Sequence, residues 1–139
     1  MKGLAELFES TCDLLTEGIS VNKIRKAITQ ENVVVIFYDD PEEGDNILPG
    51  FRTIEPYVYG ISMAGNDVIR AWLVGGTSRT GRADPSLVPG WRLFRVDRIK
   101  SWRNTRRKFF GRKLPREKYN PRDHGMIRVF NYVPTQQVP

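Results

Sequence analysis

The feature that most constrains the fold is an uninterrupted run of β-branched and aromatic residues, Val33-Val34-Val35-Ile36-Phe37-Tyr38. Side chains of these types are favoured on the pleated surface of a sheet, and the run contains no strong helix former. The sequence therefore predicts a buried strand over residues 33–38.

Further strand patterns follow along the chain, each bounded by Gly, Pro, Asn or Asp. Pro56 cannot donate to a ladder, so it marks an edge, a bulge or a strand start. Gly65 and Asn66 tolerate positive φ and predict a hairpin turn. Residues 39–50 and 75–90 are predicted loops. The four further strands are expected over residues 52–59, 67–74, 91–96 and 126–133.

The segment before the first strand carries helical patterns instead. Residues 4–16 place Leu4, Leu7 and Leu14 close to a 3.6-residue period and predict an amphipathic helix. Ser20 is a suitable N-cap for a second helix over residues 21–30. We therefore expect a mainly β protein, a small Sm-like antiparallel β-barrel with N-terminal helices and an extended basic C-terminal arm.

Charge is distributed unevenly around this expected barrel. Residues 1–49 hold ten acidic and four basic side chains, whereas residues 91–128 hold fourteen basic and three acidic ones. Such polarity indicates partners rather than fold, and the basic part is expected to bind polyanions. The expected organisation is a helical segment over 1–31, the barrel over 32–102, and a basic extension over 103–139 with a candidate final strand at 126–133.

The sequence gives little support to catalysis, so we expect no enzyme activity and no cofactor or metal. The chain contains one histidine, His124, one cysteine, Cys12, and no phosphate-binding glycine loop. The acidic residues 39–45 lack the calcium-loop pattern and are expected to be a solvated loop. No signal peptide or membrane span is expected, which favours a cytoplasmic protein, or a virion component if a phage encodes it.

One stretch resembles a known family. The matching pieces are the strand ending in Tyr38, Arg52-x-x-Glu55-Pro56, and Arg92-x-Phe94-Arg95-x-Asp97-Arg98-Ile99. They resemble the WYL domain, a small Sm-like barrel, over residues 33 to about 102. The family's Trp-Tyr-Leu is replaced by Asp67-Val68-Ile69, so ligand contacts of those aromatics do not transfer. The resemblance implies a ligand-sensing or nucleic-acid-binding module, with Arg52, Arg92, Arg95 and Arg98, and more loosely Tyr38, near a nucleotide or single strand.

The residue chemistry points the same way independently. Arginine presents a planar pair of donors that suits phosphate, and aromatic side chains among basic ones offer surfaces on which bases stack. Trp102, Phe109 and Phe110 are interspersed with basic residues. Phe94, Ile99 and Trp91 are instead expected in the core, and Asp97 is expected to pair with a neighbouring arginine. The basic candidates in this stretch are Arg103, Arg106, Arg107 and Lys108.

Three functions remain open on this sequence. The first is a regulatory module that binds single-stranded DNA or RNA, or a nucleotide. The second is a phage structural or assembly protein whose barrel and basic arm dock on acidic protein partners, virion neighbours or packaged DNA. The third is an adaptor that inhibits a host polymerase or nuclease.

Overall fold

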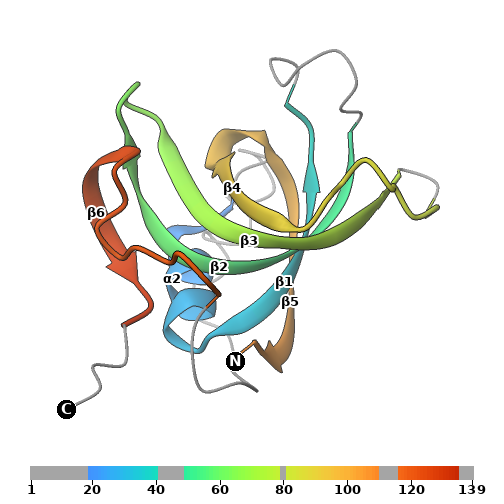
Figure 1. Ribbon diagram of the computed structural model, residues 1–139, viewed down its shortest axis with the longest axis horizontal. Helices are drawn as coiled ribbons and strands as arrows, with labels where there is room; N and C mark the ends of the chain where they lie inside the picture. The colour runs from blue at the N-terminus through green and yellow to red at the C-terminus, as the bar shows by residue number, and fades with distance from the viewer. Residues whose placement is uncertain (1–18, 41–48, 79–80, 110–115, 135–139) are drawn as a thin grey trace, which may run out of the picture.

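The fold is one curled antiparallel sheet with a helix packed on it (Figure 1). The computed structural model describes residues 19–40, 49–78, 81–109 and 116–134. The predicted helix over 4–16 and the acidic loop over 41–48 lie outside these residues. The described elements are α2 (Val21–Thr29), β1 (Asn32–Tyr38), β2 (Gly50–Ser62), β3 (Asp67–Ser78), β4 (Gly90–Arg95), a 3-10 turn η1 (Val96–Arg98), β5 (Ile99–Lys108) and β6 (Met126–Tyr132).

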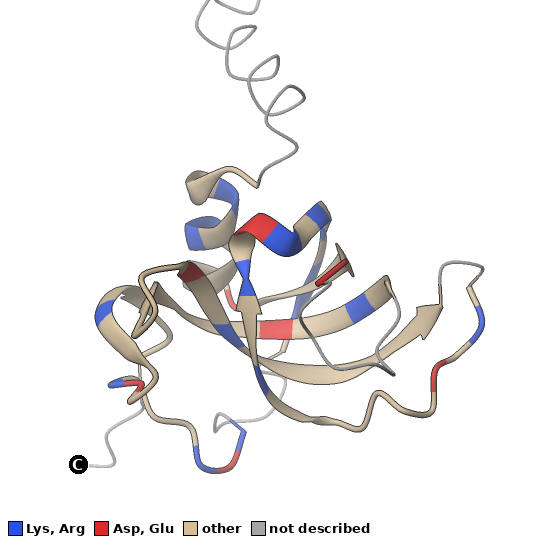
Figure 2. Cartoon of the chain, turned by 90° about the horizontal axis from the view of Figure 1, so that it is seen from above, with Lys and Arg blue, Asp and Glu red and all other residues tan. Residues whose placement is uncertain are grey.

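Helix α2 confirms the prediction for residues 21–30. The Ser20 hydroxyl accepts a hydrogen bond from the Lys23 amide at 3.4 Å and caps the helix. Ile24, Ala27 and Ile28 are fully buried, because their spacing places them on one face against the sheet. The basic residues of α2, which are blue along its ribbon in Figure 2, are exposed.

The strand β1 behaves as its composition predicts. Its buried residues alternate with half-buried ones, so Asn32, Val34, Ile36 and Tyr38 share the inner face. β1 lies between β2 and β5 in the strand order β4-β3-β2-β1-β5. The long strand β2 pairs with β3 along one edge, while its other edge pairs first with β1 and then with β6.

The prediction of a mainly β, antiparallel protein is confirmed, but the described strands do not close into a barrel. In the described ladders β4 pairs with β3 and β5 pairs with β1, and no ladder joins β4 to β5. The 3-10 turn Val96–Arg98 separates these two strands and turns the chain from one edge of the sheet to the other.

The strand β5 crosses the expected boundary between barrel and extension at residues 102/103. The first six residues of that extension belong to β5, and three of them, Arg103, Asn104 and Lys108, pair with β1, so the expected extended arm begins with a sheet strand. The residue composition does not indicate this strand, because its charged side chains stay exposed and its strand conformation depends on pairing with β1. The predicted final strand over 126–133 is confirmed by β6.

An aromatic cluster around Tyr57 fastens the later part of the chain to the sheet. The Tyr57 ring lies 4.9 Å from that of Trp91 and 4.8 Å from those of Phe109 and Tyr119. Beside it, Arg116 forms two 2.9 Å hydrogen bonds with the carboxylate of Glu55. Residues 116–119 are therefore part of the packed structure rather than a solvated tail.

Candidate anion-binding groove

A groove of about 610 Å³ lies between α2 and β5, on the inner side of the sheet. Side chains from three neighbouring elements meet there because β5 pairs with β1 and α2 packs against β1. Four of the lining residues are basic, three are amides and one is a tryptophan. They are Lys23, Lys26, Gln30, Asn32, Trp102, Asn104, Arg106 and Lys108.

The β5 contribution follows from strand alternation. Trp102 is paired with Ile36 and Asn104 with Val34, and side chains at paired positions lie on the same face of a sheet. Because Ile36 and Val34 point to the inner face, Trp102 and Asn104 point there too, beside the helix. Arg103 and Arg107 are exposed and lie outside the groove lining.

A bulge in β5 sets the position of Arg106. The register with β1 shifts between the Val34–Asn104 and Asn32–Lys108 pairs. Arg106 adopts φ 62°, a left-handed conformation that costs a residue with a Cβ about 1 kcal/mol. The Asn104 side-chain oxygen accepts the Arg106 amide hydrogen at 2.7 Å and holds this conformation. The bulge therefore adds a basic residue to the groove.

The groove has a positive field. None of its described lining residues is a carboxylate, while Lys23, Lys26, Arg106 and Lys108 are all cationic. Lys108 spans the groove floor, since its Nζ donates to the Gln30 carbonyl of α2's C-cap at 2.6 Å. Nearby, burial raises the pKa of Glu31 above its usual value, although the Lys108 charge opposes this shift. Four cations around a half-buried indole are suited to phosphates and a stacked base.

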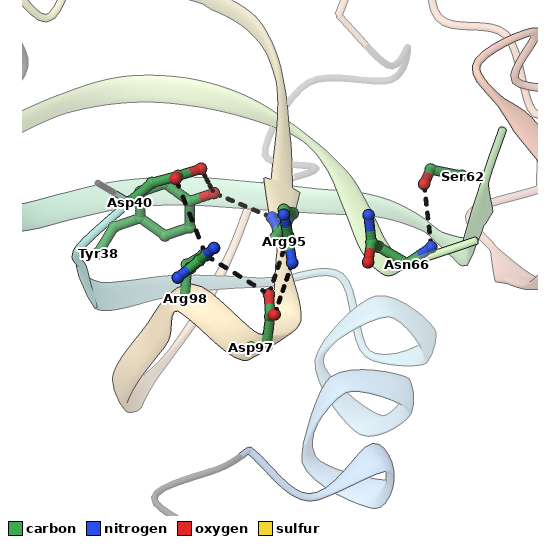
Figure 3. A network of polar contacts seen from close by, with 7 residues as sticks. All are labelled: Tyr38, Asp40, Ser62, Asn66, Arg95, Asp97 and Arg98. Atoms are coloured by element: carbon green, nitrogen blue, oxygen red, sulfur yellow. Dashed lines mark hydrogen bonds and ion pairs between the residues drawn. The ribbon is translucent and has the colours of Figure 1, made fainter. Parts of the chain in front are cut away.

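The motif residues Tyr38, Arg95 and Arg98 occupy a different place (Figure 3). The Tyr38 hydroxyl donates to Asp40 at 3.2 Å and accepts the Arg95 amide hydrogen at 3.0 Å. Arg95 donates to both oxygens of Asp97, at 3.0 and 2.8 Å. These bonds join the end of β1 to β4 and the 3-10 turn, so they fix the connection between the two strands.

The charges in this network are largely balanced. The Arg98 Nε lies 3.8 Å from an oxygen of Asp40 and 4.0 Å from one of Asp97. Hydrogen bonding from Arg95 lowers the pKa of Asp97, which burial opposes and the charges of Arg95 and Arg98 reinforce. The prediction that Asp97 pairs with a neighbouring arginine is confirmed, as is the core placement of Phe94 and Ile99.

The other two motif arginines donate hydrogen bonds to backbone carbonyls. Arg52 is 3% exposed and donates to the Phe51 carbonyl at 3.3 Å. Arg92 donates to the carbonyls of Trp91 and Val88, both at 2.9 Å, and so ties the preceding loop to β4. The arginines of the motif therefore do not converge on one hollow.

Of the nine predicted site residues, Arg106 and Lys108 line the groove. Lys23 and Lys26, in the helix predicted over residues 21–30, were not predicted as site residues. Their separation by three residues, which puts both on one helix face, was the available signal. The amides Gln30, Asn32 and Asn104 gave no signal in the sequence, because only the β1–β5 pairing brings them together.

Two properties of the described residues bear on other functions. Residues 19–40, 49–78, 81–109 and 116–134 contain no cluster of three or more His, Cys, Asp or Glu side chains arranged to hold a metal ion. Within the same ranges, no helix has the length and apolar character needed to span a membrane. No family model, curated protein or solved structure matches this chain.

Proposed function

We propose that this protein is a non-enzymatic nucleic-acid-binding module that holds a single strand in the groove between α2 and β5. The observation that supports this most is the meeting of four cations around Trp102 in a groove whose described lining has no carboxylate. Phosphates would bind to the lysines and to Arg106, and a base would stack on the Trp102 indole.

The motif arginines support a different role from the one that the sequence indicated. Arg95 and Arg98 lie beside carboxylates, and Arg92 is bonded to backbone carbonyls. A cation already paired in this way gains less from a phosphate, because its existing partner must be displaced. We therefore assign binding to the groove and fold maintenance to the motif.

We propose that the fold derives from the WYL domain that the sequence resembles. A helix precedes an antiparallel series from β1 to β4, and β5 returns to pair with β1. This order supports our proposal that the curled sheet is an opened form of the small Sm-like barrel that the resemblance implies. The binding function does not depend on it.

The test is fluorescence anisotropy with a labelled single-stranded oligonucleotide and two charge-matched variants. Lys23→Gln/Lys26→Gln removes two charges from the groove, and Arg103→Gln/Arg107→Gln removes two exposed charges outside it. We expect about a tenfold or greater loss of affinity in the first variant and a much smaller loss in the second. Equal losses would mean that general charge, rather than the groove, attracts the ligand.

The assembly-protein alternative rests on a separate surface. β6 exposes apolar side chains, with Ile127 61% and Tyr132 50% exposed, and Met63 is 69% exposed. Exposed apolar side chains mark a protein contact where they form a contiguous patch. If this alternative holds, Ile127→Ser/Tyr132→Ser abolishes association with the protein's neighbours, while the groove variants retain it.

A further inference from the structure

The floor of the groove contains a polar atom whose hydrogen-bonding capacity is unused. Asn32 is 2% exposed, and its Oδ1 has no hydrogen-bond partner among the described residues. Its Nδ2 donates to the Gln30 Oε1 at 3.1 Å, which orients the amide and leaves the oxygen as the acceptor. A buried acceptor without a partner destabilises a fold, so its presence at a candidate site indicates a ligand contact.

The position of Asn32 relative to Trp102 separates two contacts. Asn32 is paired with Lys108 and Ile36 with Trp102, so the two lining residues are four strand positions apart. At the rise of a strand this distance is about 13 Å. A base stacked on Trp102 is too small to reach Asn32 as well. The two contacts would therefore be made by different nucleotides of one strand.

Two exposed residues next to Asn32, Gln30 and Lys108, have side chains that can rotate. The Gln30 amide lies on Asn32, and Lys108 is bonded to the Gln30 carbonyl. Gln30 and Lys108 are both exposed to solvent. A phosphate that attracts Lys108 competes with its 2.6 Å bond to the Gln30 backbone carbonyl, and a separate rotation of the exposed Gln30 side chain would give a base access to Oδ1 without any change in the sheet.

We propose that Asn32 reads a nucleobase, accepting a hydrogen bond from an exocyclic amine and so favouring cytosine over thymine; this inference rests on the proposed function. Cytosine carries an amine at the position where thymine carries a carbonyl. The amine satisfies Asn32, whereas the carbonyl would face it with a second acceptor. Apart from the C5 methyl group of thymine, the two pyrimidines are alike in size, so phosphate contacts contribute equally to both and stacking on Trp102 contributes similarly.

The experiment compares oligo(dC) with oligo(dT) of equal length at neutral pH by anisotropy. We expect the full chain to bind oligo(dC) about three- to tenfold more tightly, the effect of one hydrogen bond. In Asn32→Leu, which is similar in size and has no acceptor, the ratio should fall to about one, because oligo(dC) loses a hydrogen bond that oligo(dT) does not make. The same variant should unfold at a higher temperature, because the unsatisfied oxygen is gone.

A ligand-side control avoids reliance on one variant. Dimethylation of the cytosine amine removes its donor hydrogens, so the modified oligonucleotide should bind the unaltered protein no better than oligo(dT). Equal affinity for oligo(dC) and oligo(dT), or a preference that survives either change, would overturn the base-reading inference while leaving groove binding intact. Failure to bind either oligonucleotide would overturn the proposed function and this inference together.

Discussion

Arg106 offers a perturbation in which stability and binding should move in opposite directions. Its φ of 62° lies in the region that a residue with a Cβ adopts at a cost of about 1 kcal/mol. Glycine has no such cost, although in ordinary strand positions it is about 0.5–1 kcal/mol less stable than alanine. The relative stability of the Arg106→Gly and Arg106→Ala variants therefore tests whether the bulge holds residue 106 in the left-handed conformation.

The expected magnitudes follow from the geometry. Arg106→Gly should be about 1 kcal/mol more stable than Arg106→Ala, which moves the urea midpoint by about 0.5 M for a domain of this size. Both variants lose one groove cation, so the slope of log affinity against log salt should become shallower by about 0.7. Arg106→Lys keeps the charge and should keep the slope.

Urea unfolding followed by tryptophan fluorescence, combined with anisotropy across a salt series, measures both quantities. An Arg106→Ala protein at least as stable as Arg106→Gly would refute the left-handed bulge. An unchanged salt slope in both variants would instead mean that Arg106 contacts no phosphate. The two results are independent, so either half of the reasoning can fail alone.

Three further outcomes are expected from contacts outside the groove. Arg116→Leu should destabilise the fold by about 3 kcal/mol in urea unfolding, because the Glu55 carboxylate, which is 4% exposed, loses two hydrogen bonds from the guanidinium. A double variant that also replaces Glu55 with Gln should recover part of this loss, because it removes the unpaired buried charge. The pKa of Asp123 is lowered because the hydrogen bond and charge of Arg70, with other donors, outweigh the effect of burial. Its contribution is therefore complete above a pH of about 4 and is lost as the pH falls through the lowered value, so the urea midpoint should drop in acid less steeply for Asp123→Asn. Gly60→Ala should cost about 1–3 kcal/mol by the same assay, since a Cβ there would lie 2.1 Å from a backbone oxygen of β6; a neutral effect would contradict the close β2–β6 approach.

Local patterns predicted most of the secondary structure. The apolar run at 33–38, the turn residues at 65–66 and the cap at Ser20 each act through neighbouring residues, so they were visible along the chain. The strand over residues 99–108 was not predicted, because its exposed charges resemble those of a solvated arm. Its strand character depends on β1, whose edge provides the hydrogen-bonding partners.

The sequence alone determined that this protein has a mainly antiparallel β fold and a strongly basic later half, since strand patterns and net charge are properties of residue order and composition. The tertiary structure decided which basic residues are available to a ligand. Folding brings Asp40 and Asp97 to Arg98, and it places Lys23 and Lys26 beside Arg106 across the α2–β5 groove. Electrostatic interactions depend on distance in space, so the same excess of positive charge could not indicate from its order in the chain where it is neutralised and where it remains open to an anion.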